Sequence, residues 1–129
     1  MPTRREVVTR KSTDNIAVDH PDFILALRFI RENATYRISV NDVVEYVQVS
    51  RRTLYRWFQK YLQRSPEKEI LRVKMRRAGE LLLTTDENIE QVGKQVGYPL
   101  VGHFIRAFRK YYGKTPKTFR LERKIHAEK

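Results

Sequence analysis

Two arginines, Arg56 and Arg106, stand in matching surroundings fifty residues apart along the chain. Each lies two residues before a phenylalanine, and each segment ends in a Ser-Pro or Thr-Pro pair that can open a helix. A guanidinium group carries five N–H donors in a planar fork, so it can bond bidentately to a phosphate or to O6 and N7 of guanine. No nucleophile and no phosphate-cradling glycine loop accompanies these residues, so their chemistry is that of binding.

The match between the two segments includes apolar as well as basic positions. The paired residues are Val40 with Ile89, Val43 with Val92 and Val47 with Val96 at an offset of 49, then Leu54 with Phe104, Arg56 with Arg106, Phe58 with Phe108, Lys60 with Lys110, Tyr61 with Tyr111, Ser65 with Thr115 and Pro66 with Pro116 at an offset of 50. Apolar residues at this spacing share one face of a helix, so each copy predicts a short helix, a turn and a longer, basic-faced helix. That pattern is typical of a helix-turn-helix unit, whose second helix enters the major groove of DNA.

Capping signals place the remaining helices around this repeat. Ser39 or Asn41 can cap the first helix of the first unit, Ser50 can cap the second, and Pro66 opens a long helix to about Leu83. We predict an all-α fold of about seven helices, in which two helix-turn-helix subdomains are joined by a long linker helix. In the longer helix of the second unit, we expect the inward side chains to be Phe104, Ala107, Phe108 and Tyr111.

The predicted linker helix has a length that suits binding to one face of DNA. Its 18 or so residues would span roughly 27 Å. Neighbouring major-groove segments on one face of B-DNA lie about 34 Å apart. One chain could therefore read two adjacent half-sites without forming a dimer.

Composition limits the classes of function. Lys and Arg number 27 against 15 Asp and Glu, and the formal net charge of +12 suits an acidic polymer or an anionic surface as partner. The chain has no cysteine, which excludes Cys-ligated zinc and thiol nucleophiles. Its histidines are far apart, and no segment is apolar for long enough to span a bilayer. We expect a cytoplasmic protein that is not an enzyme, has no cofactor and no metal, and does not bind a membrane.

Two segments carry a resemblance to a known family. LLLTTDENIEQVGKQVGY at 81–98 and FIRAFRKYYGKTPKTFR at 104–120 resemble the DNA-binding domain of the AraC/XylS family of bacterial regulators, and the resemblance extends over about 22–120. Within that family, VVTRKSTDNIAV at 7–18 together with ALRFIREN, SRRTL and EILRVK is most similar to the xylose-operon activator subgroup.

The resemblance implies a domain organisation and a function. The expected segments are a linker or tail from a missing N-terminal sensor domain at 1–20, an AraC-type DNA-binding domain at 21–122 and a charged tail at 123–129; within the domain, the first helix-turn-helix lies at about 39–63, the linker helix at about 66–84 and the second helix-turn-helix at about 88–113. The implied function is sequence-specific binding of double-stranded DNA in two adjacent major-groove segments, as part of a bacterial transcription regulator of xylose-like sugar catabolism. The most similar subgroup consists of activators, and the sequence leaves activation and repression open. RNA polymerase is an implied partner, and a sugar effector would act only through the missing domain.

Carried over position by position, the resemblance also implies contact residues. The expected base contacts are Arg52, Tyr55, Arg56, Val101, Gly102, His103 and Arg106. The expected phosphate contacts are Ser50, Arg51, Lys60, Lys110, Lys114, Thr115 and Lys117. The first unit should provide more of the base discrimination, because the second begins with an apolar stretch that can read thymine methyl groups but few hydrogen-bonding edges.

The chain departs from the family pattern at three positions. Val44 and Gly93 stand where a small alanine is usual in the first helix of each unit, and Gln63 replaces the usual glycine. Gln63 must therefore accept a strained left-handed cap, or the helix must end differently.

Several alternatives remain open for single residues. Arg56 and Arg106 could pair with an acidic residue of the fold instead of DNA. Tyr55 could pack at the rim of the interface, and His103 could be an ordinary surface residue. Trp57 is expected in the core or facing a partner, although aromatic side chains in single-strand binders stack on bases.

Three classes of function other than sequence-specific DNA binding are compatible with parts of the sequence. The basic charge also suits nonspecific packaging of nucleic acid or RNA binding. A DNA repair enzyme with a similar reader is disfavoured by the missing cysteine and metal site. A protein-interaction role, involving Trp57 or the acidic residues Glu87 and Glu90, would add to DNA binding. A repeated helical hairpin used only for packing would not require the cationic faces.

Overall fold

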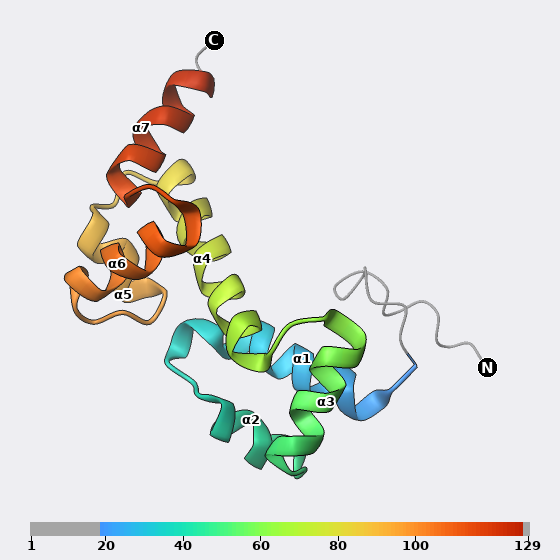
Figure 1. Ribbon diagram of the computed structural model, residues 1–129. Helices are drawn as coiled ribbons and strands as arrows, with labels where there is room; N and C mark the ends of the chain where they lie inside the picture. Colours follow the sequence, from blue (N-terminus) through green and yellow to red (C-terminus); the bar gives the residue numbers. More distant parts are fainter. Residues whose placement is uncertain (1–18, 128–129) are drawn as a thin grey trace.

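The computed structural model describes the chain from residue 19 to residue 127, and its side chains as far as residue 123. The expected sensor linker at 1–20 therefore lies almost entirely outside the described residues, whereas the backbone of the expected tail at 123–129 is described as far as residue 127 and continues the last helix. The helices are α1 (Pro21–Asn33), the 3-10 helix η3 (Ala34–Tyr36), α2 (Val40–Val47), α3 (Arg51–Leu62), α4 (Pro66–Thr84), α5 (Ile89–Gln95), α6 (Val101–Tyr112) and α7 (Pro116–Ala127) (Figure 1). No strand occurs in this range, and the predicted all-α fold is confirmed.

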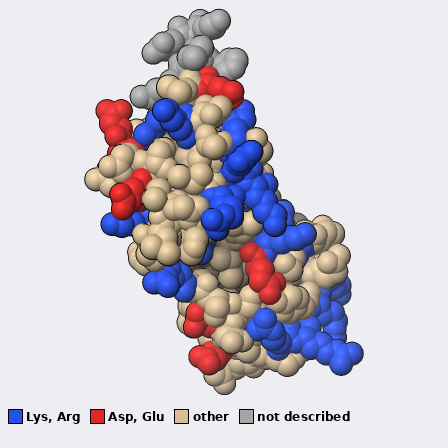
Figure 2. Space-filling view, turned by 60° about the vertical axis from the view of Figure 1, so that its left-hand side comes forward, with Lys and Arg blue, Asp and Glu red and all other residues tan. Residues whose placement is uncertain are grey.

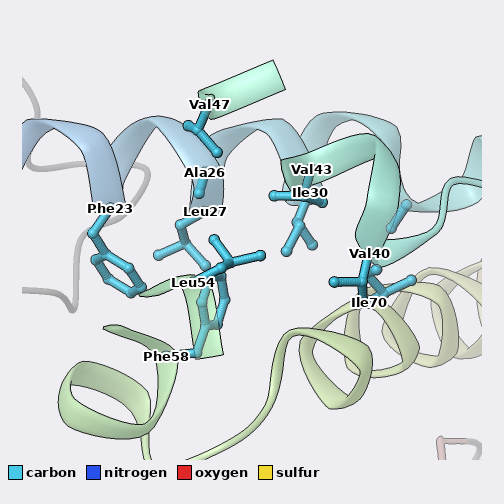
Figure 3. Close-up of a cluster of buried hydrophobic side chains, with 11 residues drawn as sticks. Phe23, Ala26, Leu27, Ile30, Val40, Val43, Val47, Leu54, Phe58 and Ile70 are labelled. Atoms are coloured by element: carbon cyan, nitrogen blue, oxygen red, sulfur yellow. The ribbon is translucent and has the colours of Figure 1, made fainter. Parts of the chain in front are cut away.

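The first hydrophobic core lies between α1, α2, α3 and the beginning of α4. Its larger side chains point toward one another from these four helices (Figure 3). Complete burial of each large apolar side chain stabilises the fold by about 1.5–3 kcal/mol. The buried members are Phe23, Ala26, Leu27, Ile30, Ala34, Val40, Val43, Val47, Leu54, Phe58 and Ile70.

A second core is built in the same way from the rest of α4 with α5, α6 and α7. Its buried members are Met75, Ala78, Leu81, Leu82, Val92, Val96, Phe104, Phe108 and Phe119. The matched aliphatic, phenylalanine and proline positions of the repeat are buried in both units, except Ile89, which is half-buried; of the matched tyrosines, Tyr61 is half-buried and Tyr111 is exposed. The repeat in the sequence therefore reflects two units with equivalent core positions. Helix α4 supplies side chains to both cores.

The prediction that Tyr111 faces inward is wrong. Its side chain is 39% exposed, whereas the neighbouring Tyr112 is half-buried and its hydroxyl donates to the carbonyl of Met75 at 3.1 Å. In the first unit the matching Tyr61 packs against the ring of Phe23, with 4.9 Å between ring centroids. Among the described residues, the ring contact of Tyr111 is with Tyr112 alone, so no aromatic side chain of another helix covers it.

The departure at Gly93 is explained by the side chain that faces it, and Val44 stands at the matching position of the first unit. Gly93 is buried, and a Cβ added to it would come within 3.0 Å of the side chain of Phe104. The first unit has the smaller Leu54 where the second has Phe104, and there Val44 is half-buried at the edge of the core. Each unit therefore keeps its packing by combining one larger and one smaller residue.

Two charged clusters, not expected from the sequence, hold the ends of α4. The fully buried carboxylate of Glu69 pairs with Arg31 at 3.3 Å, Arg64 at 2.6 Å and Arg72 at 3.4 Å. At the other end, the guanidinium of Arg120 donates to the carbonyls of Leu82 (2.8 Å), Thr85 (3.1 Å) and Glu87 (2.7 Å). Arg120 thus satisfies backbone acceptors of the last turn of α4 and of the loop that follows, which the helix itself leaves unpaired.

Gln63 adopts the left-handed conformation, with φ of 56°, and Gly113 has the same role after α6, with φ of 81°. A side chain in this region costs about 1–2 kcal/mol. We therefore expect Gln63→Gly to raise the free energy of unfolding by about 0.5–1 kcal/mol, after the greater freedom of glycine in the unfolded chain is counted. Gly113→Gln, the reciprocal exchange, should lower it by a similar amount. Urea unfolding measures both, and a less stable Gln63→Gly variant would contradict this account.

Arg120→Lys should destabilise the protein, because one ammonium group cannot replace the planar fork that reaches three carbonyls. We expect a loss of about 2–3 kcal/mol in the free energy of unfolding. Arg109→Lys is the matched control: Arg109 is exposed on α6 and should change stability by less than about 0.5 kcal/mol. Equal effects of the two substitutions in thermal unfolding would show that the carbonyl contacts do not matter.

Candidate nucleic-acid interface

In each unit, the longer second helix is the one expected to enter the major groove, and it is called the recognition helix below. In the first unit this is α3, which presents free cationic side chains. Ser50 caps it by accepting a hydrogen bond from the backbone amide of Thr53 at 3.0 Å. Arg52 and Arg56 are exposed, and no carboxylate in the described part of the chain lies within ion-pair distance of either. The alternative that Arg56 pairs with an acidic residue of the fold is therefore not observed. Both guanidinium groups are available to a ligand.

The second recognition helix, α6, begins with a different surface. Val101 is half-buried, whereas Gly102 and His103 are exposed. A Cβ added at Gly102 would meet no atom within 4 Å, so this face of the helix is open. Arg106, one turn further on, is exposed and has no carboxylate partner among the residues that the structure describes.

Tyr55 and Arg51 belong to a polar cluster at the start of α3. The hydroxyl of Tyr55 donates to the carboxylate of Glu67, and Arg51 lies 3.9 Å from the same carboxylate oxygen. Arg51 also donates to the side-chain oxygen of Asn41 at 2.7 Å and approaches the Tyr55 hydroxyl at 3.5 Å. Burial, together with the hydrogen bond and negative charge of Glu67, raises the pKa of Tyr55 above its ordinary value. Tyr55 is half-buried. This partial exposure is compatible both with the predicted base contact and with packing of the ring at the rim of the interface.

The expected phosphate contacts are engaged to different degrees. Lys110 and Lys117 are exposed, and neither has an acidic partner within the described residues. The ammonium group of Lys60 lies 5.4 Å from the ring centroid of Tyr61. Lys114 forms an ion pair with Glu122 at 2.6 Å.

Two hydroxyl groups of the same set already have a structural role. The side chain of Thr115 accepts a hydrogen bond from the amide of Thr118 at 3.2 Å, in the first turn of α7. Ser50 does the same for α3. Oxygens that cap helices in this way lie at helix N-termini, where backbone amides can also meet a phosphate.

Trp57, Glu87 and Glu90 have structural partners that the sequence did not identify. Trp57 is half-buried against the first core, with its ring centroid 4.6 Å from that of His20. Glu87 accepts a hydrogen bond from Gln95, and Glu90 lies 3.8 Å from Lys94. The expectation that Trp57 belongs to the core agrees with its position.

Charge is distributed unevenly over the surface. Figure 2 shows Lys and Arg gathered in a band that follows one side of the molecule along both units, while most Asp and Glu of this view lie toward the other side. Such a band attracts a polyanion and raises its rate of association. In the part of the chain that the structure describes, no three metal-ligating side chains come together. No helix of that part is long and apolar enough to cross a membrane.

A direct contact supplements α4 in joining the two units. The turn before α6 contains Gly97, with φ of 95°, and a Cβ added there would lie 3.2 Å from the carbonyl oxygen of Thr35 in η3. Nearby, the ammonium group of Lys74 lies 5.0 Å from the ring centroid of Tyr98. Burial and the neighbouring charge of Arg37 lower the pKa of Lys74. Backbone contact at Gly97 therefore restricts how the two recognition helices can be oriented.

Comparison with known proteins identifies the kind of domain. A family model described as a helix-turn-helix domain matches residues 43–122. The xylose operon regulatory protein of Haemophilus influenzae is 35% identical over 115 residues, 89% of this chain and 30% of that protein. Its namesake in Escherichia coli K12 is 32% identical over 114 residues, 88% of this chain and 29% of that protein. The chain thus spans about 30% of the length of these relatives.

Solved structures share the fold. The structure of a xylose-binding transcription activator is 32% identical, with a TM-score of 0.72 over 84% of this chain and 29% of that one. An AraC-type regulator from Chromobacterium violaceum is 34% identical, with a TM-score of 0.72 over 80% of this chain and 92% of that one. The DNA-binding domain of AdpA, solved with a target DNA, is 20% identical and has the same fold, with a TM-score of 0.75 over 81% of this chain and 95% of that one. Because the family model matches more than half of its length, the chain belongs to the AraC-type helix-turn-helix DNA-binding domains of transcription regulators.

Proposed function

We propose that the chain binds double-stranded DNA sequence-specifically, with α3 and α6 in two adjacent major-groove segments. The observation that carries the proposal is the exposure of an unpaired arginine at the same position of two equivalent helices, Arg56 and Arg106. Core packing alone does not account for two such groups. An arginine at this position of a recognition helix can bond bidentately to guanine.

The spacing of the two units supports binding to one face of DNA. Helix α4 has 19 residues and therefore a length of about 28 Å. This is close to the separation of about 34 Å between successive major-groove segments on one face of B-DNA. The contact between Gly97 and Thr35 adds a second restraint on the orientation of the units.

The relatives indicate the kind of genes that the regulator controls. Two of them are named as regulators of a xylose operon, so we infer that this chain is the DNA-reading part of a regulator of sugar catabolism. A sugar effector would act through a part of the regulator outside the matched segment. Nonspecific packaging of nucleic acid is the competing function, and it is favoured by the net charge of +12.

Selection of bound sites from a random duplex library tests the proposed function. We expect two short conserved blocks whose centres lie about 10–10.5 base pairs apart. Tight binding without enrichment of any sequence would favour nonspecific packaging instead. Loss of affinity with added salt does not separate the two functions, because both involve phosphate contacts.

Arg56→Ala and Lys110→Ala should differ in kind when measured on the selected site and on its single-base variants. Arg56→Ala should remove discrimination at particular base pairs, by about 1–3 kcal/mol. Lys110→Ala should weaken all duplexes alike and reduce the slope of log affinity against log salt by about 1. Equal losses on every duplex for both variants would contradict the assigned roles.

Gly102→Glu should separate folding from DNA binding. Glutamate as the second residue of α6 should stabilise the free protein by about 0.5–1 kcal/mol, because it favours the helix more than glycine and suits the positive helix end. The same carboxylate should weaken binding of the selected duplex at least about tenfold, because it would face the bases and phosphates. Gly102→Ala is the matched control, since the added Cβ meets no atom within 4 Å and carries no charge. Unchanged binding by Gly102→Glu would place this residue away from DNA.

A further inference from the structure

The repeat brings opposite charges to the same place in the two units. At the offset of 50 residues, Glu67 corresponds to Lys117, and each is the second residue of the helix opened by a Ser-Pro or Thr-Pro pair. Lys117 is exposed and has no ion-pair partner within the described residues. The second unit therefore offers a free ammonium group where the first unit carries a carboxylate.

In the first unit this carboxylate is occupied by two side chains of α3. Glu67 accepts the hydroxyl hydrogen of Tyr55 and lies 3.9 Å from Arg51. Asn41, on α2, holds the other terminal nitrogen of Arg51 at 2.7 Å. The side chains of Arg51 and Glu67 are 53% and 52% exposed, so the cluster lies at the surface, at the N-terminal end of the recognition helix.

Glu67 is ionised at neutral pH. Burial is the largest single influence and raises its pKa, but hydrogen bonds from Tyr55, Ser65 and a backbone amide, with the charge of Arg51, outweigh it and lower the pKa. A negative charge therefore persists beside the groups that would approach the DNA backbone. Repulsion between this charge and a phosphate weakens binding, and a phosphate must compete with Glu67 for Arg51.

We propose that Glu67 limits the affinity of the first helix-turn-helix unit for the DNA backbone, by holding Arg51 and by placing a negative charge where the second unit has Lys117. This inference rests on the proposed function, because it requires that α3 approaches DNA. In this arrangement the first unit depends more on base contacts, from Arg52 and Arg56, than on phosphate contacts. Glu67 is thus an affinity-limiting residue that favours discrimination between sequences.

The test compares Glu67→Gln with the wild-type chain on a duplex of unrelated sequence, by fluorescence anisotropy between 50 and 200 mM salt. Glutamine still accepts the Tyr55 hydrogen bond, so the substitution removes the charge alone. One phosphate contact contributes about 0.9 to the slope of log affinity against log salt. We expect the slope of Glu67→Gln to be steeper by about that amount, with affinity at 50 mM salt about threefold higher or more. Glu67→Lys should give a larger gain, because it recreates the arrangement at Lys117.

Further variants make the comparison specific. Glu80→Gln removes the same charge from α4, at a side chain that is 58% exposed, is paired with Arg77 at 3.1 Å and is not among the predicted contacts. Relative to Arg51→Gln, the double variant Arg51→Gln/Glu67→Gln should lose most of the gain that Glu67→Gln shows over the wild-type chain, because no guanidinium is then released. Thermal unfolding of each variant shows that it is folded before its affinity is compared.

The outcomes separate this inference from the proposed function. A gain in Glu67→Gln above that in Glu80→Gln, lost in the double variant, supports it. Affinity and slope equal to those of Glu80→Gln, or weaker binding by Glu67→Gln, overturn it while the proposed function stands. A wild-type chain that binds neither the unrelated nor any selected duplex overturns both.

Discussion

Helix α4 is the element on which the rest of the structure depends, because it is part of both hydrophobic cores. Ile70 is buried in the first core, and Met75, Ala78 and Leu82 are buried in the second. Neither unit can therefore turn about the linker without exposing part of its own core. A flexible linker would leave the spacing of the recognition helices to DNA, whereas a shared helix sets that spacing before binding and reduces the entropy lost on binding. Preorganisation of this kind follows from apolar packing.

The two units show how one backbone arrangement can carry different cores and different surfaces. Leu54 with Val44 in the first unit and Phe104 with Gly93 in the second stand at equivalent positions of the repeat and divide the volume differently, so core residues can vary while α3 and α6 keep their places. The exposed residues differ more freely, because no packing restrains them. The result is a cationic first helix and a second helix with an open, largely apolar beginning. The two units therefore keep the same backbone arrangement, while the exposed residues of α3 and of α6 can differ from each other.

Local signals predicted most of the fold, and the contacts that escaped prediction join residues distant in the sequence. Helical periodicity and the caps at Ser50 and Ser65 depend on residues within one or two turns, so the sequence contains them directly. The carboxylate of Glu69 reaches Arg31, and the guanidinium of Arg120 reaches three carbonyls, each more than thirty residues away in the sequence, and a helix pattern does not indicate such partners. The prediction that Tyr111 faces inward is wrong for the same reason, because its burial depends on whether an aromatic side chain of another helix packs against it. The predicted DNA contacts follow from the family resemblance and remain predictions.

The acidic residues of a strongly basic chain have separate physical roles. Glu69 is buried and neutralises part of a cluster of three arginines, so its contribution is to the fold. Glu67, two residues earlier on α4, is half-exposed and engages two side chains of the recognition helix, Tyr55 and Arg51. Side chains two apart on a helix point in different directions, which explains how neighbouring carboxylates can serve the core and the surface separately. For a reader that must find one site among many, each additional phosphate contact strengthens the wrong complexes as well as the right one. A surface carboxylate beside the recognition helix therefore acts on selectivity by restraining the part of the affinity that carries no sequence information.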